Sequence, residues 1–390
     1  MNHSSADPYS RSSTPTACLR ARRGSVLVIT MVVIFAIAGM VLSLGRWSRT
    51  ELLVSANTLA TLQASAAERG AEQYVMKILA TDRANLHVYT QDEFAAITTG
   101  QGGGLFWIVR PDYGDPELPA YGLVDESTKI NINNANFTTL QRLPLMTDEI
   151  AASIVDWRDE NENPTQTLGA ESTVYMGRAD GYNAKNANFE TVEELLLVNG
   201  MTRDLLFGTN KLRRLTPVGI TSSGSDGDEN MVRSNGYFDY FTAWSKSTVT
   251  TGNNTTTPAG RIAINFAPRA IIKAMAELSD AEVDKLMRER QSTLESDDPY
   301  STTWVSQAMG SNRLNNQITG QGLVYSADIV AASGNGRAFK RVRIVVDVSG
   351  TTPVVLYRRD ITDQGWPLDP EVLMALRSGE AASLVNGSVF

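Results

Sequence analysis

Oxygen-bearing side chains alternate along one acidic stretch of the chain, at Asp159, Asn161 and Asn163. Carboxylate and amide oxygens at every second position are typical of the first three ligands of an EF-hand calcium loop. Two positions depart from that loop. Pro164 replaces its turn glycine, and Ala170 stands at the twelfth position, where a bidentate carboxylate is required. An ordinary EF-hand is therefore excluded.

A looser calcium cage is compatible with the same stretch. All of its members would offer the hard oxygen ligands that calcium prefers, and they would be Asp156, Asp159, Asn161 and Glu171. A solvated acidic loop explains these residue types equally well. Residue types alone therefore leave the two interpretations open.

No other group of residues indicates catalysis. The sequence has no P-loop, no Gly-x-Ser-x-Gly elbow and no nucleophile paired with a histidine. His3, His87 and Cys18 are too few and too far apart for a zinc site. We therefore expect a structural or binding protein and not an enzyme.

The charge balance bears on the class of partner. Formal net charge is −8, and residues 1–24 hold four Arg and one Asp, which leaves 31 basic and 42 acidic residues in the rest. Nucleic acid is bound by basic surfaces, because its phosphates must be neutralised. So acidic a body is a poor match for DNA or RNA, and we expect no nucleic acid partner.

An apolar segment near the N-terminus predicts a membrane anchor. Residues 25–45 carry no charge and as a helix would span about one bilayer thickness. Arg20, Arg22 and Arg23 precede them. Basic flanking residues favour the cytoplasmic side. We expect a single-pass inner-membrane protein with its N-terminus in the cytoplasm and its body in the periplasm.

The anchor is expected to continue as a longer helix. No proline occurs between residues 25 and 80, and apolar residues recur at helical spacing from Leu52 to Leu79. We predict one helix over 25–80, apolar on all sides in residues 25–45 and amphipathic in residues 46–80. Residues 1–24 would form a leader before it.

Two later segments share a helical pattern. Asn133 and Arg158 are separated by 25 positions, as are Asn265 and Arg290, with matching apolar offsets between them. Residues 188–201 form a looser third copy. The pattern resembles helix-hairpin-helix units, which serve either to bind DNA phosphates or to pack helices. In so acidic a chain we favour packing, and a gel-shift assay would distinguish the two.

The remaining pattern predicts an antiparallel sheet. Residues 105–110 and 121–124 are expected to form short strands, and residues 321–332, 339–348 and 354–359 a three-stranded meander. The fold class is thus α+β: a long N-terminal helix packed on a small antiparallel sheet, with a large inserted α-helical domain. We assign residues 81–128 and 311–365 to the sheet domain, 129–310 to the insertion and 366–390 to a tail.

This layout resembles that of type IV prepilins and pseudopilins. Gly24 matches the position after which a prepilin peptidase cuts, and Ser25 would become the new, methylated N-terminus. Such proteins usually have Glu at the fifth mature position, where this chain has Ile29. In such proteins that Glu pairs with the terminal amine of a neighbouring subunit, since an unpaired charge in lipid is costly. The resemblance implies that this chain, with Ile29, cannot make the pairing.

Within the family, the chain resembles the K-type minor pseudopilin of type II secretion. The likeness rests on Ile29 and on a run of short motifs in a specific order, namely Asp156-Trp-x-Asp, Gly169-Ala-Glu, Tyr175, Val192-Glu-Glu-Leu and Gly200-Met. The resemblance implies calcium in the body, which favours the cage over the solvated loop.

The resemblance also implies a role and partners. The protein would cap or initiate the pseudopilus that exports folded proteins across the outer membrane. Its partners would be other minor pseudopilins in a tip complex, the major pseudopilin below them, and the prepilin peptidase. The alternatives are a membrane-anchored helix-hairpin-helix DNA-binding protein and a minor pilin of a type IV pilus.

Overall fold

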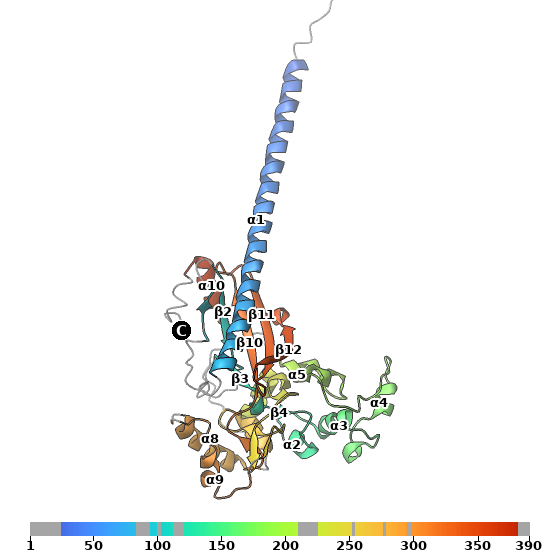
Figure 1. Ribbon diagram of the computed structural model, residues 1–390. Coiled ribbons are helices and arrows are strands. Elements are labelled where there is room, and N and C mark those ends of the chain that lie inside the picture. The colour runs from blue at the N-terminus through green and yellow to red at the C-terminus, as the bar shows by residue number, and fades with distance from the viewer. Residues whose placement is uncertain are drawn as a thin grey trace, which may run out of the picture. The chain divides into compact units, whose positions relative to one another are not determined.

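The computed structural model describes residues 25–82, 94–99, 103–111, 121–209, 225–251, 254–275, 278–294, 296 and 298–380. The chain divides into two units between Ala56 and Asn57, and the helix α1 (Ser25–Thr81) continues through that boundary (Figure 1). The single long helix predicted for residues 25–80 is therefore confirmed. Gly24 and the rest of the leader lie outside the described residues.

The C-terminal part of α1 packs through small side chains. Its buried stripe follows the helical period and consists mainly of alanines, namely Ala60, Ala64, Ala67, Ala71 and Val75. Leu59 and Leu62, which fit the apolar periodicity of the sequence, are exposed instead. Small residues let the helix approach the sheet closely, so the larger leucines remain on the outside.

A six-stranded antiparallel sheet forms the base for this half of α1. Its strands follow the order β1-β2-β10-β11-β12, and β3 also pairs with β10. Their bounds are β1 (Ile97–Thr98), β2 (Leu105–Val109), β3 (Val124–Asp125), β10 (Val324–Ala332), β11 (Phe339–Asp347) and β12 (Val354–Asp360). The predicted meander and its union with the earlier strands are both confirmed, and the fold is α+β.

The two faces of the sheet are covered by different helices. Side chains alternate along β2, so Phe106 and Ile108 join the cluster under α1. Trp107 points to the opposite face, where it packs with Val372 and Leu376 of α10 (Pro370–Ser378). The segment assigned to a tail, residues 366–390, therefore contributes the helix α10, which covers the second face.

Between β3 and β10 the chain forms a separate lobe. Its helices are α2 (Phe137–Gln141), α3 (Asp148–Arg158), α4 (Ser172–Met176), α5 (Arg203–Phe207), α6 (Ser225–Asn235), α7 (Arg269–Met275), α8 (Asp280–Leu294) and α9 (Thr303–Met309). Its short strands pair as β4 (Ile130–Asn131) with β5 (Phe241–Thr242), β6 (Val249–Thr251) with β7 (Asn254–Thr256), and β8 (Ile262–Ala263) with β9 (Ile318–Thr319). Figure 1 shows α2, α3 and α4 on one side of this lobe and α8 and α9 on the other.

Short 3₁₀ helices join these elements. They are η3 (Glu126–Thr128), η4 (Thr165–Thr167), η5 (Val192–Leu197), η6 (Tyr237–Asp239) and η7 (Thr362–Gln364).

The lobe contains a structural repeat. The elements β4, α2 and α3 begin at Ile130, Phe137 and Asp148, and β8, α7 and α8 begin 132 positions later in each case. Arg158 donates to the main-chain carbonyl of Ala135. In the second copy Arg290 donates to the carbonyl of Ala267 at 2.9 Å. The shared Asn–Arg spacing therefore reflects one helical hairpin built twice.

The two asparagines of the repeat do not cap the helices that follow them. The N-cap of α2 is Asn136, whose Oδ1 accepts the N–H of Thr139 at 2.8 Å. Asn133 instead exchanges hydrogen bonds with the main chain of Phe189, and Asn265 donates to the carbonyl of Ser301 at 2.8 Å. Each asparagine thus ties its hairpin to a later loop.

Candidate functional site

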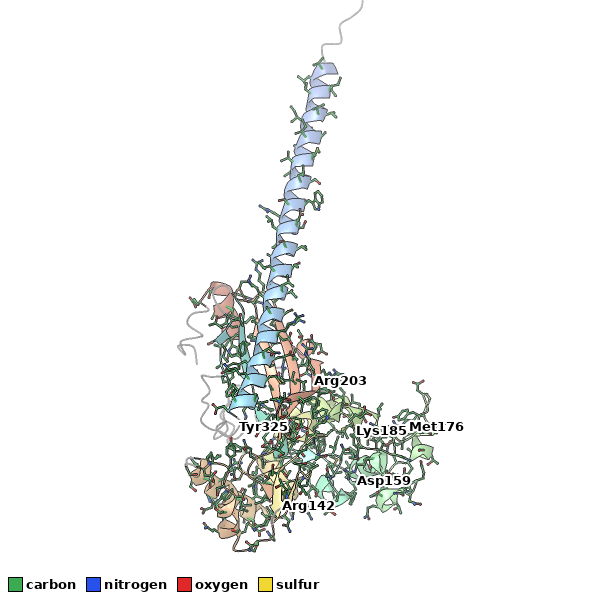
Figure 2. All side chains as sticks on the ribbon, in the orientation of Figure 1. Arg142, Asp159, Met176, Lys185, Arg203 and Tyr325 are labelled. Atoms are coloured by element: carbon green, nitrogen blue, oxygen red, sulfur yellow. The ribbon has the colours of Figure 1, made fainter. Side chains whose placement is uncertain are left out.

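The carboxylates singled out in the sequence lie at the end of α3 and the beginning of α4. Thr147 caps α3, and the helix carries Asp156 into the lobe, where its side chain is fully buried. Glu171 is the residue just before α4 and is 2% exposed. Asp159 lies at the C-terminal end of α3 and is half-buried, in the part of the lobe that also carries Lys185 and Met176 (Figure 2).

These two buried carboxylates have unused oxygen atoms. Asp156 Oδ1 accepts the N–H of Thr165 at 2.9 Å. Its Oδ2 and both carboxylate oxygens of Glu171 are buried and have no hydrogen-bond partner among the described residues. Burying an ionised carboxylate without compensation is costly. A proton, a water molecule or a cation at these oxygens would offset that cost.

The pKa values of Glu171 and Asp156 are raised, as expected for buried carboxylates. Burial, together with the negative charges of Asp156, Asp159 and Glu162, raises the pKa of Glu171 to about 7. The pKa of Asp156 is also raised, mainly by burial, although the hydrogen bonds from Thr165 oppose the shift. A bound cation would relieve the repulsion, and near neutral pH it would displace the proton on Glu171.

Two residues of this site were missed in the sequence. Glu162 accepts hydrogen bonds from Ser172 Oγ and from Asn186 Nδ2, both at 2.9 Å. The other amide atom of Asn186, Oδ1, is buried and unpaired among the described residues. Asn186 donates its main-chain N–H to the carbonyl of Trp157 at 3.0 Å. Asn186 lies well after Asp156 and Glu171 in the sequence, so no local pattern indicated that it belongs to this site.

Asn161 lies differently from the other predicted ligands. Its side chain is exposed, and its Oδ1 accepts the N–H of Asn163 at 2.8 Å. Its own N–H donates to Asp159 Oδ1 at 3.3 Å. The alternation of oxygen-bearing residues in the sequence is thus used here for turn-forming hydrogen bonds.

The donors present are of the type that calcium takes. In the part of the chain that the structure describes, no three Asp, Glu, His or Cys side chains converge closely enough to hold a metal ion. The unpaired buried oxygens of Asp156, Glu171 and Asn186 are nevertheless all hard ligands, and calcium completes its shell with main-chain carbonyls and water. A β-carbon on Gly169 would lie 1.7 Å from Asp156 Oδ2, so a larger residue there would have to displace this carboxylate. These unpaired oxygens are therefore of the chemical kind that calcium takes.

The hairpin turn between α2 and α3 packs against the rest of the lobe. The carbonyl of Pro144 accepts a hydrogen bond from the hydroxyl of Tyr237 at 2.5 Å. Leu145 adopts a φ of 65°, a conformation that favours glycine, and its side chain packs against the hydrophobic core of the lobe. The turn whose amides would contact phosphate in a DNA-binding hairpin is used here for packing.

The third hairpin is formed by shorter elements. The predicted copy over residues 188–201 forms the 3₁₀ helix η5, with a capping box between Thr191 and Glu194. Gly200 follows with a φ of 82°, and α5 then begins at Arg203. The helix–turn–helix order holds, while the first helix is 3₁₀ and not α.

At the N-terminus, Ser25 is the first residue of α1 and Ile29 is 61% exposed. In the described part of the chain, α1 is the one helix whose length and composition would allow it to cross a membrane.

Comparison with known proteins connects the chain to one family and to a solved structure. Residues 126–217 match the family model described as type II secretion system (T2SS), protein K. A protein in the crystal structure of the GspK-GspI-GspJ complex from the type 2 secretion system of enterotoxigenic Escherichia coli is similar at 13% identity and a TM-score of 0.45, over 77% of this chain and 96% of that one. A comparison with curated protein sequences gave no match. The resemblance to protein K of the type II secretion system that the sequence predicted is confirmed by the family model over residues 126–217.

Proposed function

We propose that this chain is a minor pseudopilin that caps or initiates the type II secretion pseudopilus and so supports export of folded proteins across the outer membrane. The family match over residues 126–217 carries the proposal. That segment belongs to a lobe inserted into a sheet. The C-terminal half of α1 packs on the sheet, and its N-terminal half is apolar.

The proposed position at the tip rests on Ile29. A subunit whose fifth mature residue carries no carboxylate has no charge to pair with the terminal amine of a neighbour. Such a subunit would accept other subunits below it and none above it. The partners would be other minor pseudopilins, with the major pseudopilin below.

Maturation would proceed as in prepilins. A prepilin peptidase would cut after Gly24, and Ser25 would become the N-terminal, methylated residue. The Arg residues before the apolar segment favour a cytoplasmic N-terminus, with the body in the periplasm. Mass spectrometry of the mature protein tests this step, because an intact leader on the assembled protein would contradict it.

Calcium would be held by Asp156 and Glu171, with Asn186 as an amide ligand and Asp159 and Glu162 contributing negative charge. Bound calcium would neutralise the carboxylates, while the residues themselves join the end of α3 to the start of α4. A folded loop at this place would order the segment that carries the family match.

The role is tested by deleting the gene and complementing it with the full-length protein. We expect a secreted reporter enzyme to accumulate in the periplasm of the deletion strain and to return to the medium on complementation. Normal secretion in the deletion strain would contradict the proposal, and loss of pilus-dependent motility alone would assign the protein to a type IV pilus.

The position at the tip is tested separately with Ile29→Glu, using Ile37→Val as the control within the same apolar segment. If Ile29 specifies the tip, the Glu variant should enter the filament below it, where crosslinking to the major pseudopilin would occur on both sides. Unchanged crosslinking would remove the argument from Ile29 without affecting the assignment to type II secretion.

A further inference from the structure

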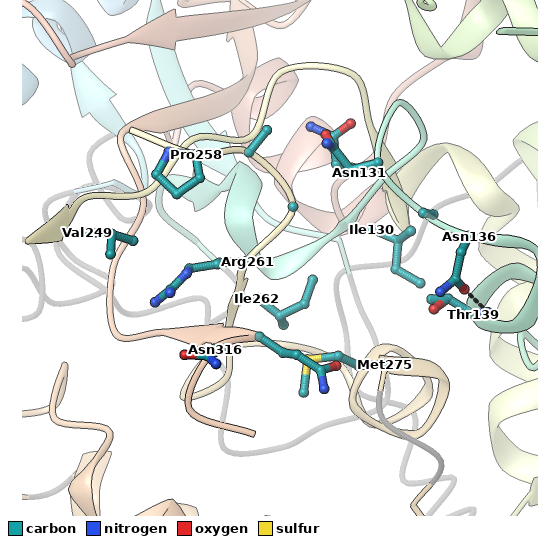
Figure 3. A pocket seen from close by; sticks show the side chains of 15 residues that line it. Ile130, Asn131, Asn136, Thr139, Val249, Pro258, Arg261, Ile262, Met275 and Asn316 are labelled. Carbon is teal, nitrogen blue, oxygen red and sulfur yellow. Dashed lines mark hydrogen bonds between the residues drawn. The ribbon is translucent and has the colours of Figure 1, made fainter. Parts of the chain in front are cut away.

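A cleft of about 400 Å³ lies where the two copies of the hairpin repeat meet (Figure 3). It is bounded by the start of α2, the end of α7 and the segments that lead into β8 and β9. This volume is within the usual range of small-molecule sites, about 300–1,000 Å³. Its lining is rich in amide side chains, from Asn131, Asn134, Asn136, Asn316 and Gln317.

Several of these amides have unused hydrogen-bonding groups. Asn134, Asn316 and Gln317 are exposed, and their side chains make no hydrogen bond to other described residues. Asn136 uses only its Oδ1, on the N–H of Thr139, as the dashed line in Figure 3 shows. The cleft therefore presents donors and acceptors together, as a peptide backbone requires.

The charge in the cleft is opposite to that of the protein. Among the described residues that line it, Arg261 is the one ionisable side chain, and none is Asp or Glu. Its Nη1 lies 3.4 Å from the carbonyl of Ile318, and it forms no ion pair with the described residues. In a protein of net charge −8, a guanidinium that forms no ion pair with the described residues is complementary to an anion from outside.

The side chains that line the cleft limit the chemical class of ligand that it can bind. A guanidinium pairs with a carboxylate through two parallel hydrogen bonds, and amide side chains match peptide groups. The described lining residues include no aromatic side chain on which a sugar ring or a nucleobase would stack. We propose that this cleft binds an extended peptide whose carboxylate is held by Arg261. The inference does not depend on the role in secretion proposed above.

The carboxylate has two sources, the terminal carboxylate of a polypeptide or an acidic side group, and three short peptides distinguish them. The first is acetyl-Ala-Ala-Ala with a free carboxylate, the second is the same peptide as a carboxamide, and the third is acetyl-Ala-Asp-Ala as a carboxamide. Each is titrated against the full-length protein in detergent micelles, with saturation-transfer NMR as the readout. We expect the neutral peptide not to bind and at least one acidic peptide to bind.

Arg261→Gln should weaken binding of the acidic peptide by about tenfold or more, since it removes a charged, two-point contact. Arg288→Gln, an exposed arginine of α8 outside the cleft, should leave binding unchanged. Ala259→Glu places a carboxylate in the cleft at an exposed position and should abolish binding without unfolding the lobe. If the three peptides fail to bind the wild-type protein, or bind Arg261→Gln equally well, the proposal is wrong.

Discussion

Asp328 of β10 and Arg341 of β11 form a two-point ion pair inside the sheet, with Nε 2.9 Å from Oδ1 and Nη2 2.6 Å from Oδ2. Both side chains are buried. Asp328 also accepts a hydrogen bond from Arg343, which reaches Asp239 of the lobe at 3.3 Å and lies over the ring of Phe238. This buried network joins the sheet to the lobe.

Removing Asp328 is expected to be severely destabilising. Asp328→Ala removes the carboxylate that pairs with Arg341 and leaves Arg343 with Asp239. We expect the free energy of unfolding to fall by about 3–5 kcal/mol. Glu229→Ala removes one partner of the exposed pair with Arg233 and should cost no more than about 0.5 kcal/mol. Urea unfolding of the full-length protein in micelles measures both, and equal effects would show that the network contributes little.

A rise in pH should destabilise the calcium-free protein and should increase the stabilisation that calcium provides. Without calcium, the raised pKa of Glu171 means that the folded state holds its proton more tightly than the unfolded state, so stability is highest below about pH 4.5 and is lost as pH rises to about 7. Calcium needs the deprotonated carboxylate, so its stabilising effect should grow over the same range. Melting temperatures with calcium and with a chelator, at about pH 5.5 and about pH 8, test this. A melting temperature unaffected by the chelator at both pH values would contradict the calcium site.

Replacing Glu171 by the neutral isostere Gln should distinguish the effect of charge repulsion from the effect of calcium binding. Glu171→Gln removes the repulsion with Asp156, so at neutral pH the protein without calcium should be as stable as wild type or more so, while the stabilisation by calcium should disappear. Glu160→Gln is the matched control on the neighbouring exposed surface and should keep the response to calcium. If both variants lose the stabilisation by calcium, the effect would come from the overall negative charge of this region and not from a specific site.

The shared geometry of the two hairpins predicts that each depends on its arginine. Arg290 is buried and donates to the carbonyl of Ala267, so Arg290→Met leaves a buried carbonyl with one fewer donor. We expect a loss of about 2–4 kcal/mol and a loss below about 0.5 kcal/mol for the exposed Arg288→Met. Similar melting curves for the two variants would show that the arginine is dispensable for the hairpin.

Local periodicity was enough to predict much of the fold. The helix of residues 25–80 lacks proline, and the strands alternate, so their types follow from neighbouring residues alone. The repeat was visible because Arg158 and Arg290 stand at equal distances from equivalent residues. The role of α10 could not be predicted, and its residues were assigned only to a tail, since its contact with Trp107 joins segments far apart in the sequence.

The site was only partly visible for the same reason. Asp156 and Glu171 lie within one local stretch, and their type suggested ligands. Asn186 enters through a hydrogen bond to Glu162 that depends on how the later loop returns to the lobe. The alternation at Asn161 has a local cause, turn formation, that imitates a ligand pattern. Residue types therefore indicated a site of oxygen ligands, while tertiary packing determines which residues contribute to it.

The topology of the sheet constrains the order in which the protein is made. β2 ends at Val109, while its partner β10 begins at Val324, after the whole lobe. At a synthesis rate of about 5–20 residues per second, β2 waits of the order of ten seconds or longer for that partner. The lobe is therefore synthesised before the sheet can close, and β2 remains without its neighbour β10 until more than four fifths of the polypeptide has been made.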